Sequence, residues 1–499
     1  MAQNDQDSRG IRYWMEQVVK EADKARDGMK ADPVHDLRVA IRRCRSIGEG
    51  FVAIDPHPAW KKMRKSAKPL FAALGDLRDV QVQMEWADKL SSDEEPVHQE
   101  LLLHFSAREK TLQTAASDAL AAFDLPQWQS WATILEERSQ KIPPGSDVFQ
   151  LMALERWQEA RNLQTVAMRN RSKLALHSLR IGLKKFRYIV ENFLPEKHDA
   201  WIKDLKQLQD LLGDIHDLDV LWDTAREIRA FVSPQEREQW LSKQKRERQM
   251  RLDDYRKKMV GRETLWSVWR SELPHAASLH SAIQNYFEMW VFLRDQDLSH
   301  THRVLQWSLQ IFDTLVDAKA IRTRDFDGLP WRELLSIAAL THASAEGKYH
   351  KRIVKELERL TPPPGWKPIH LEVTGLIARY HRGPLPGSQS KFVRLRQSAK
   401  NAVSQLAGIL RIAESLDINH DGTIQQLEMS ISEGTLRINA LGYEDRTRQA
   451  ERIARARHLL ESVLQMPIIV RAIKIKEDEK LPTRPRPPRL SRAFRPAKS

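Results

Sequence analysis

The sequence contains two similar stretches, VHDLRVAIRRCRSIGEGF from Val34 to Phe51 and LHSLRIGLKKFRYIVENF from Leu176 to Phe193. Aligned without a gap, they place histidine on histidine and cation on cation. The matched pairs are His35 with His177, Arg38 with Arg180, Arg42 with Lys184, Arg43 with Lys185, and Arg45 with Arg187. A second match follows in each case, LGDLRDVQV from Leu74 and LGDIHDLDV from Leu212. Two matches in the same order predict a duplicated unit of roughly 120–140 residues.

Helical spacing sorts each stretch into two faces. His35, Arg38, Arg42 and Arg45 fall within an arc of about 80°, and the equivalent residues of the second stretch do the same. Apolar residues, among them Cys44, occupy the opposite face, so we interpret Cys44 as a core residue rather than a reactive thiol. Each stretch is therefore predicted to be an amphipathic helix with a cationic polar face.

A cationic face is most often simply solvated, and that interpretation stays open here. Like charges stacked at helical spacing repel one another by about 0.2–0.5 kcal/mol per pair unless a counter-charge is present. Solvated faces usually mix both signs, whereas these two carry few acids and occur twice. The pattern favours an anion-binding site.

A second helix is expected to follow each stretch. Its basic face would carry Lys61, Lys65 and Lys68 in the first copy, and Lys203 and Lys206 in the second. Each copy then reaches a GD-x-x-D sequence, which holds Gly75, Asp76 and Asp79 or Gly213, Asp214 and Asp217. We expect the glycine to end the helix and the acids to cap the next one, with metal binding as the alternative.

The composition sets the broad class of protein. The chain has 499 residues, a net charge of +14, 19 glycines and one cysteine, which favours helices and a reducing cytoplasm. Lys and Arg exceed Asp and Glu by 6 in residues 35–68, by 4 in residues 173–206 and by 7 in the last twenty residues. No apolar run is long enough for a membrane span and the N-terminus lacks an apolar signal core, so neither a membrane nor secretion is expected.

The repeated basic helices resemble the CHAD family, the conserved histidine α-helical domain, over roughly residues 10–270. The resemblance implies two helical-bundle halves related by pseudo-twofold symmetry, whose basic helices line a groove or pore that binds inorganic polyphosphate. The implied binding residues are His35, Arg38, Arg42, Arg45, Lys65, Lys68, His177, Arg180, Lys184, Arg187, Lys203 and Lys206. Arg43, Lys61 and Lys185 are candidates of second rank.

The residue types agree with a phosphate polymer. Such a ligand has about one charge per phosphate and no bases, so it suits Arg forks and Lys point charges without aromatic platforms. Proteins that grip single-stranded nucleic acid interleave aromatic and basic residues, but here Phe51, Phe186 and Phe193 lie on the buried side and Tyr188 is at most near the edge. A protein that reads a nucleic-acid backbone remains an alternative.

The second half of the chain has a different character, with clustered histidines and, around Glu433-Gly434, an alternating stretch that predicts a β-hairpin. A short strand near Ile468–Ile475 is expected to join it. Residues 280–475 resemble the C-terminal HD-like helical domain of the exopolyphosphatase/guanosine pentaphosphate phosphatase family, chiefly through RYHRGPLP and ILRIAESLDINHDG. We therefore expect a mainly α protein in which a duplicated helical-bundle domain precedes an α-helical HD-like domain carrying a small β-hairpin.

The HD-like half lacks part of a metal-binding pattern. Metal-dependent HD phosphohydrolases have ligands in the order H…HD…D, and the resemblance puts His300, His342 and Asp417 at three of these positions. The residue after His342 is Ala343, so the central carboxylate is lost. We predict no metal, no cofactor and no catalytic residue. His350 and His381 are either additional anion contacts or ordinary histidines.

The sequence also lacks phosphate-loop and triphosphate-tunnel motifs. The expected protein is a non-catalytic polyphosphate binder in the cytoplasm, associated with polyphosphate granules, whose HD-like half is an accessory or homodimerisation module. A phosphohydrolase acting on polyphosphate or a nucleotide is the main alternative. The expected parts are a disordered N-terminus (1–9), the CHAD-like domain (10–275, with halves of about 10–140 and 150–275), the HD-like domain (276–476) and a disordered basic tail (477–499).

Overall fold

The computed structural model describes residues 10–170, 172–294, 297–321, 325–345, 352–387 and 390–473. The fold is mainly α, as predicted, with two small sheets. The chain divides into two compact units, Met1–Leu279 and His280–Ser499. No helix in the described ranges has the length and apolarity needed to cross a membrane. The predicted disordered segments at the two ends, like His350, lie outside the described residues.

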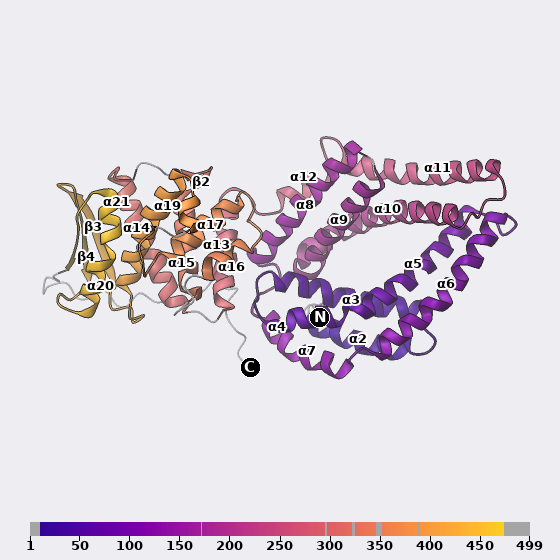
Figure 1. Ribbon diagram of the computed structural model, residues 1–499, viewed down its shortest axis with the longest axis horizontal. Coiled ribbons are helices and arrows are strands. Elements are labelled where there is room, and N and C mark those ends of the chain that lie inside the picture. The colour runs from indigo at the N-terminus through magenta and orange to yellow at the C-terminus, as the bar shows by residue number, and fades with distance from the viewer. Residues whose placement is uncertain are drawn as a thin grey trace. The chain divides into compact units, whose positions relative to one another are not determined.

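The first unit consists of two sets of helices that follow one another in the chain (Figure 1). The first set comprises α2 (Ile11–Ala25), α3 (Ala31–Val52), α4 (Pro58–Ser66), α5 (Lys68–Leu90), α6 (Pro96–Ala121) and α7 (Leu125–Ser139). The second set comprises α8 (Asp147–Asn170), α9 (Lys173–Phe193), α10 (Pro195–Glu227), α11 (Pro234–Met259) and α12 (Leu265–Ser271). The two basic stretches are α3 and α9, so both are helices, as their periodicity predicts.

The apolar faces of α3 and α9 lie in the core, and Cys44 is buried with them. Burial raises the pKa of the Cys44 thiol, because a buried thiolate is poorly solvated. This thiol is therefore a packing residue, in agreement with its predicted place on the apolar face.

The expected helix ends at the GD-x-x-D sequences are wrong. Gly75 lies inside α5 and Gly213 inside α10, so the aspartates cap nothing there. The break in the first copy comes earlier, at Ala67, and Pro69 stands in the first turn of the new helix, where its missing N–H does no harm. The second copy has Gln207 at the place equivalent to Pro69, and α10 runs through without a break.

The two halves of the first unit touch at two separate places. At the first place, where α3 meets α9, Ser46 of α3 accepts a hydrogen bond from Asn192 of α9 at 2.9 Å. Gly50 has no side chain and so leaves room for the ring of Phe193. At the other, α5 and α6 share a hydrophobic core with α10 and α11, built around Trp86, Trp222 and Trp240. These contacts fix α3 and α5 against α9 and α10.

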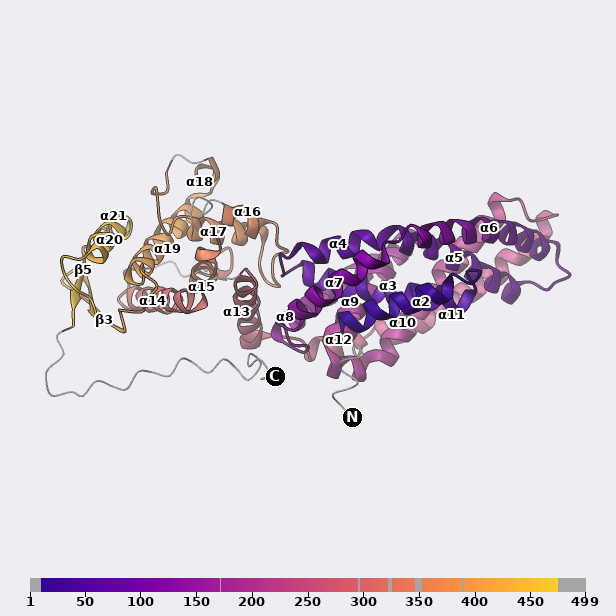
Figure 2. The same ribbon diagram turned by 90° about the horizontal axis from the view of Figure 1, so that it is seen from below.

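The second unit has a helical centre. Figure 2 shows its long helices side by side, and α14 contacts α15 and α19 while α17 contacts α15 and α19. The helices of this unit are α13 (Ala276–Phe292, which begins in the first unit), α14 (Leu298–Asp317), α15 (Trp331–Thr341), the 3-10 turn η1 (His342–Ala345), α16 (Ile353–Glu358), α17 (Pro368–Arg379), α18 (Ser390–Arg394), α19 (Gln397–Leu416), α20 (Arg448–Ala456) and α21 (His458–Leu464).

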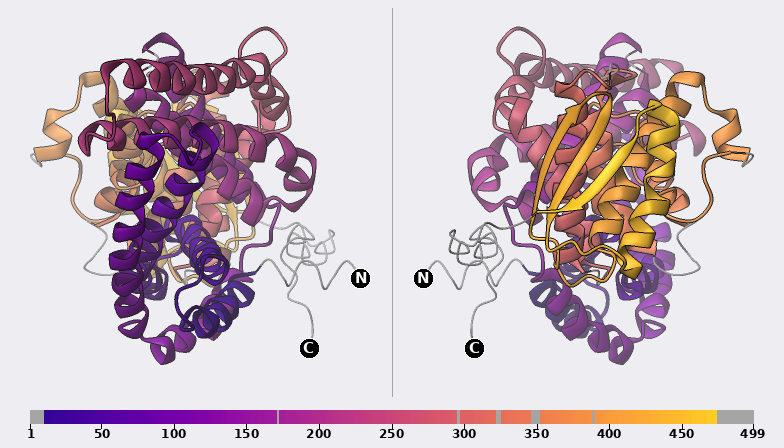
Figure 3. Two further views of the ribbon diagram at one scale, coloured as in Figure 1. Left: turned by 90° about the vertical axis from the view of Figure 1, so that its right-hand side faces the viewer. Right: turned by 90° about the vertical axis from the view of Figure 1, so that its left-hand side faces the viewer.

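The predicted hairpin is present. Strands β3 (Gln426–Ser432) and β4 (Thr435–Leu441) are antiparallel, and Glu433 and Gly434 both have positive φ at the turn between them, the backbone of a type I′ hairpin. Strand β5 (Ile468–Ala472) joins β4 in parallel, as expected. Figure 3 shows this sheet against the helices of its unit, where β3 contacts α14. A two-stranded ladder, β1 (Asp325–Phe326) with β2 (Leu329–Pro330), precedes α15.

Candidate functional site

Four predicted binding residues come together where α3 faces α9. Arg38 and Arg42 belong to α3, and Arg180 and Lys184 to α9. Burial lowers the pKa of Lys184, the three guanidinium groups lower it further, and it lies at about 8. These four residues are called the central cluster below. Cations that lie at equivalent positions of the two halves, close enough to lower one another's pKa, form a site with an excess of positive charge.

Arg38 is held in place by α5. Its guanidinium lies 4.6 Å from the centre of the Phe71 ring, and a Cβ at Gly75 would stand only 3.1 Å from its Nη1 atom. Glycine at position 75 therefore leaves space for the Arg38 side chain. This explains why a glycine occurs in the middle of α5 although it does not end the helix. Burial lowers the pKa of Arg38, and Asp79 opposes that effect.

Two carboxylates face the central cluster, one from each half. Asp79 lies on α5 and Asp217 on α10, at equivalent positions of the repeat. Burial raises the pKa of Asp217 to about 6; nearby Arg180 lowers it, while Asp79 and Asp214 raise it. The cluster thus holds four cationic side chains against two carboxylates, and one of those carboxylates gains a proton readily.

The two histidines of the repeat lie at the start of each cationic face. His35 is exposed, and burial together with the charge of Arg78 lowers its pKa. The ring of His177 lies 4.7 Å from that of His216, whose pKa burial and Arg180 lower to about 4. His177 and His216 also line a cavity of about 350 Å³ between α9 and α10, with Leu176, Leu212 and Ile215 among its walls.

Aromatic rings lie closer to the cations than the sequence predicted. Tyr188 is within 5.7 Å of the Arg42 guanidinium and 5.9 Å of the Lys184 ammonium, measured to the ring centre. Phe71, which sequence reasoning missed, lies beneath Arg38 and also beneath Arg45, at 5.0 Å. Both rings stabilise the neighbouring cations through cation–π contacts. Phe71 lies one turn before Gly75, but the equivalent residue of the second copy is Gln209, so the repeat gave no signal for this ring.

Other predicted binding residues make hydrogen bonds or ion pairs within their own half or between α3 and α9. Arg45 donates to the Arg64 carbonyl at 2.9 Å, and Arg187 donates to Gln209 at 2.9 Å and lies 3.5 Å from Glu191. Arg43 also pairs with Glu191, while Lys185 pairs with Glu159 at 3.1 Å. The arginines and Lys185 therefore help to hold α3, α4, α8, α9 and α10 in position.

The predicted lysines of the second helices are exposed. Lys61 and Lys65 lie on α4, Lys68 begins α5, and Lys203 and Lys206 lie on α10. The break at Ala67 separates the first two from Lys68, so the three do not follow one continuous helix face as predicted. Burial raises the pKa of Asp210, and the nearby Lys206 opposes that effect.

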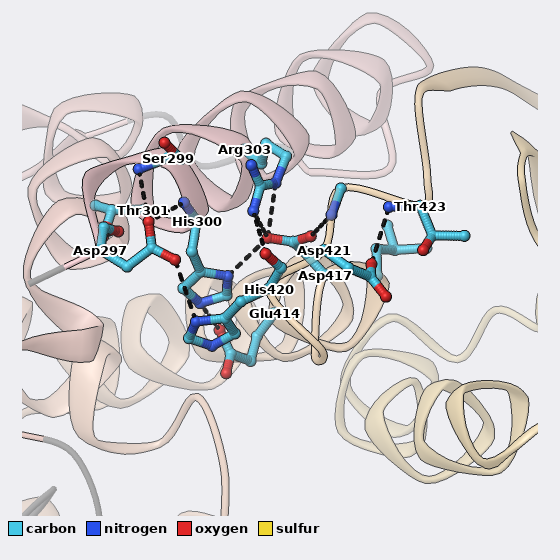
Figure 4. Close-up of polar contacts among 12 residues, drawn as sticks. Asp297, Ser299, His300, Thr301, Arg303, Glu414, Asp417, His420, Asp421 and Thr423 are labelled. Atoms are coloured by element: carbon cyan, nitrogen blue, oxygen red, sulfur yellow. Dashed lines mark hydrogen bonds and ion pairs between the residues drawn. The ribbon is translucent and has the colours of Figure 1, made fainter.

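A second polar cluster lies inside the second unit. His300 and His342, predicted at the two histidine positions, come together, but the carboxylate between them is Glu414. Asp417, placed last in the predicted order, bonds the other ring nitrogen of His300 and the side chain of Arg303 (Figure 4). Sequence reasoning missed Glu414, although a carboxylate one turn before Asp417 on an apolar helix was a usable signal.

The chain matches one family model and several solved structures. The family model described as "CHAD domain" matches residues 10–226. The chain is similar to the crystal structure of the CHAD domain from the plant Ricinus communis, with 20% identity over 54% of this chain and 90% of that one and a TM-score of 0.37. No curated protein matches the chain. The residues that match the CHAD domain family, 10–226, contain the central cluster and both copies of the basic helix.

Proposed function

We propose that the first unit binds inorganic polyphosphate at the central cluster, without hydrolysing it. The observation that carries the proposal is the convergence of Arg38 and Arg42 with Arg180 and Lys184 from the equivalent helix of the other half. Four buried or half-buried cations against two carboxylates are poorly compensated inside the protein. A flexible polyanion that threads between the halves would supply the missing negative charge at several points.

Polyphosphate fits this cluster better than nucleic acid does. Phe71 and Tyr188 already lie against guanidinium or ammonium groups, so these faces are not open platforms on which bases could stack. The cations of the cluster are also half-buried rather than spread over a broad surface. A narrow polymer of phosphates reaches such groups more easily than a stiff duplex does.

The direct test is a competition between long-chain polyphosphate and duplex DNA at matched phosphate concentration and salt. We expect clear preference for polyphosphate, and at least a hundredfold loss of affinity in an Arg38→Glu/Arg180→Glu variant. The loss follows because each reversal removes an arginine–phosphate contact and adds a repelling carboxylate. A Lys110→Glu/Lys245→Glu variant changes the net charge equally on exposed parts of α6 and α11 and should bind nearly as well as wild type.

The basic C-terminus needs its own control. The last twenty residues carry seven Lys or Arg and no acid, so they alone could attract a polyanion. Deleting residues 480–499 should weaken binding only modestly and mainly at low salt. If the deletion abolished binding while the Arg38→Glu/Arg180→Glu variant bound normally, the central cluster would not be the site.

The non-catalytic part of the proposal is supported by the burial of the second unit's polar cluster. The side chains of His300 and His342 are 1% exposed and that of Glu414 is 7% exposed, so in the described part of the chain these groups offer a phosphate chain almost no surface to contact. Incubation with polyphosphate and Mg²⁺ or Mn²⁺ should release no phosphate. Release that disappears in a His342→Ala variant would instead establish the phosphohydrolase alternative. We further propose that the protein associates with polyphosphate granules, which fluorescence microscopy of a tagged chain would test.

A further inference from the structure

Three side-chain atoms of the second unit converge on one point. Nε2 of His300 lies 3.1 Å from Oε2 of Glu414, and Nε2 of His342 lies 2.8 Å from the same oxygen. The two nitrogens are 3.2 Å apart. The three residues come from α14, η1 and α19, which are far apart in the sequence. All three are buried.

The remaining ring nitrogens of the two histidines are already engaged. Nδ1 of His342 lies 2.5 Å from the Ala339 carbonyl oxygen, so it must carry the proton and donate it. Nδ1 of His300 lies 2.8 Å from Oδ2 of Asp417, and an ionised carboxylate can only accept. Each ring therefore turns its Nε2 atom toward Glu414, with its lone pair available whenever the ring is neutral.

Asp417 is itself held in place. Arg303 donates from Nε to Oδ2 at 2.8 Å, as Figure 4 shows, and the Gly422 amide donates to Oδ1 at 3.0 Å. A carboxylate that orients a histidine through Nδ1 while the histidine uses Nε2 elsewhere is the usual outer shell of a metal-bound imidazole. Asp417 and the Ala339 carbonyl thus act on His300 and His342 in the same way.

Without a cation at the point of convergence, the three atoms are difficult to satisfy. Neutral rings would set two nitrogen lone pairs and a carboxylate against one another. If one ring is protonated, it can donate to Glu414, but the lone pair of the other ring still faces the same carboxylate oxygen. If both rings are protonated, Glu414 and Asp417 balance their charge, but the two N–H groups stand with their nitrogens 3.2 Å apart. Each arrangement leaves one buried contact unfavourable, whereas a divalent cation would satisfy all three atoms at once.

We propose that His300, His342 and Glu414 bind one divalent transition metal ion of the zinc type through Nε2, Nε2 and Oε2. Two imidazoles and one carboxylate are a ligand set that Zn²⁺ accepts at about 2.0–2.2 Å. Ligand atoms at such distances around a tetrahedral ion stand about 3.3 Å apart, so the observed separations of 2.8–3.2 Å need only a small expansion. No cluster of this kind was found elsewhere among the residues that the structure describes.

The ion would connect three segments of the unit, with a water molecule as the fourth ligand. Its ligands join α14, η1 and α19 in the middle of the unit, where two more rings surround them: His420 stacks on His300 at 3.6 Å and His381 lies 5.2 Å from His342. Because the ligands come from three separate segments, a bound ion stabilises the folded unit by its binding free energy. This inference does not depend on polyphosphate binding by the first unit.

The experiment uses the full-length protein, stripped with a chelator and then titrated with Zn²⁺ by calorimetry. We expect one high-affinity site per chain, a rise in the Tm of the second unit and, with Co²⁺ in place of Zn²⁺, the intense visible absorption of a tetrahedral ion. Glu414→Gln and His342→Gln should lose the site. Asp417→Asn should weaken it about 10–100-fold, as loss of an orienting partner does. His302→Gln, on the same helix but bonded to Glu288, should bind as wild type.

Two results would overturn the proposal. One is a stripped wild-type protein that gives neither the Co²⁺ absorption nor a Zn²⁺-dependent Tm, which would show that protons alone satisfy the cluster. The other is undiminished high-affinity binding by a Glu414→Gln variant whose circular dichroism shows it folded, which would place the ion elsewhere. The wild-type spectrum decides the question even if a variant fails to fold.

Discussion

Asp79 and Asp217 come from equivalent helices of the two halves and face the same group of cations, and Asp79 helps to raise the pKa of Asp217. The pair shows that the two halves share one electrostatic site. Each carboxylate lies one turn beyond the glycine of its GD-x-x-D sequence, so the repeated motif supplies the inner acids of the site rather than a helix cap.

Polyphosphate affinity should rise in two steps as the pH falls. Lys184, with a pKa of about 8, gains its positive charge as the pH falls through that value. Asp217, with a pKa of about 6, then loses its negative charge. Both changes favour a bound polyanion, so we expect about a tenfold gain in affinity between pH 9 and pH 5. Titrations across this range at constant ionic strength measure it.

An Asp217→Asn variant separates the two steps. It should bind polyphosphate more tightly than wild type at pH 8 and show no further gain near pH 6, because its side chain never ionises. The same flat response in wild type would contradict the assignment of that step to Asp217.

Replacing Lys184 by methionine should raise the stability of the first unit but lower its affinity for polyphosphate. The half-buried ammonium lies beside three guanidinium groups, and its partial burial is the main reason for its lowered pKa. Lys184→Met removes this unfavourable charge while keeping most of the packing, so the Tm of the first unit should rise. Polyphosphate affinity should fall about tenfold, because one charge-assisted contact is lost. Thermal unfolding and calorimetric titration provide the two measurements, and a fall in both would contradict the prediction.

The approach of α3 to α9 depends on the absence of a side chain at Gly50. A Cβ there would lie 2.6 Å from the Phe193 ring, and this ring stacks on Phe149 at 4.1 Å, so it cannot move aside. We expect Gly50→Ala to destabilise the first unit by about 1–3 kcal/mol in chemical denaturation. The matched control is Gly213→Ala in α10, where nothing lies within 4 Å, and alanine should stabilise the helix by about 0.5–1 kcal/mol.

Asp55 ties α7 to the start of α4. Its carboxylate accepts two hydrogen bonds of 2.6 Å from Arg138 and one of 2.7 Å from the Trp60 indole. Burial raises the pKa of Asp55, but these bonds outweigh it and the pKa lies below its ordinary value. Asp55→Asn should cost about 3 kcal/mol of unfolding free energy, since it removes the buried carboxylate that accepts both of these Arg138 hydrogen bonds.

The sign of the pH dependence follows from the lowered pKa. The stability contributed by Asp55 is fully present above the unfolded value of about 3.9 and is lost as the pH falls through the lower, folded value. The wild-type protein should therefore lose this part of its stability at acid pH. The Asp55→Asn variant lacks the contribution already, so its stability should not show this acid-dependent loss. Asp27→Asn, in an exposed pair with Lys30, should leave stability nearly unchanged, because solvent screens such a pair.

The sequence alone determined the fold class, the duplication and which face of α3 and α9 is cationic. Helical periodicity is local, so the repeat of His35, Arg38 and Arg42 in His177, Arg180 and Lys184 could be predicted without any tertiary contact. The hairpin at Glu433-Gly434 was predictable for the same reason, because alternation and turn residues are short-range signals.

Only the tertiary structure decided which cations share a site. Arg43 and Lys185 have the same charge as Arg38 and Lys184, yet they pair with Glu191 and Glu159, and such partners depend on which helices pack together. Glu414 meets His300 and His342 through three segments that no periodicity relates. Charge type and helix face are properties of the local sequence, whereas the partner of each charge is set by long-range packing.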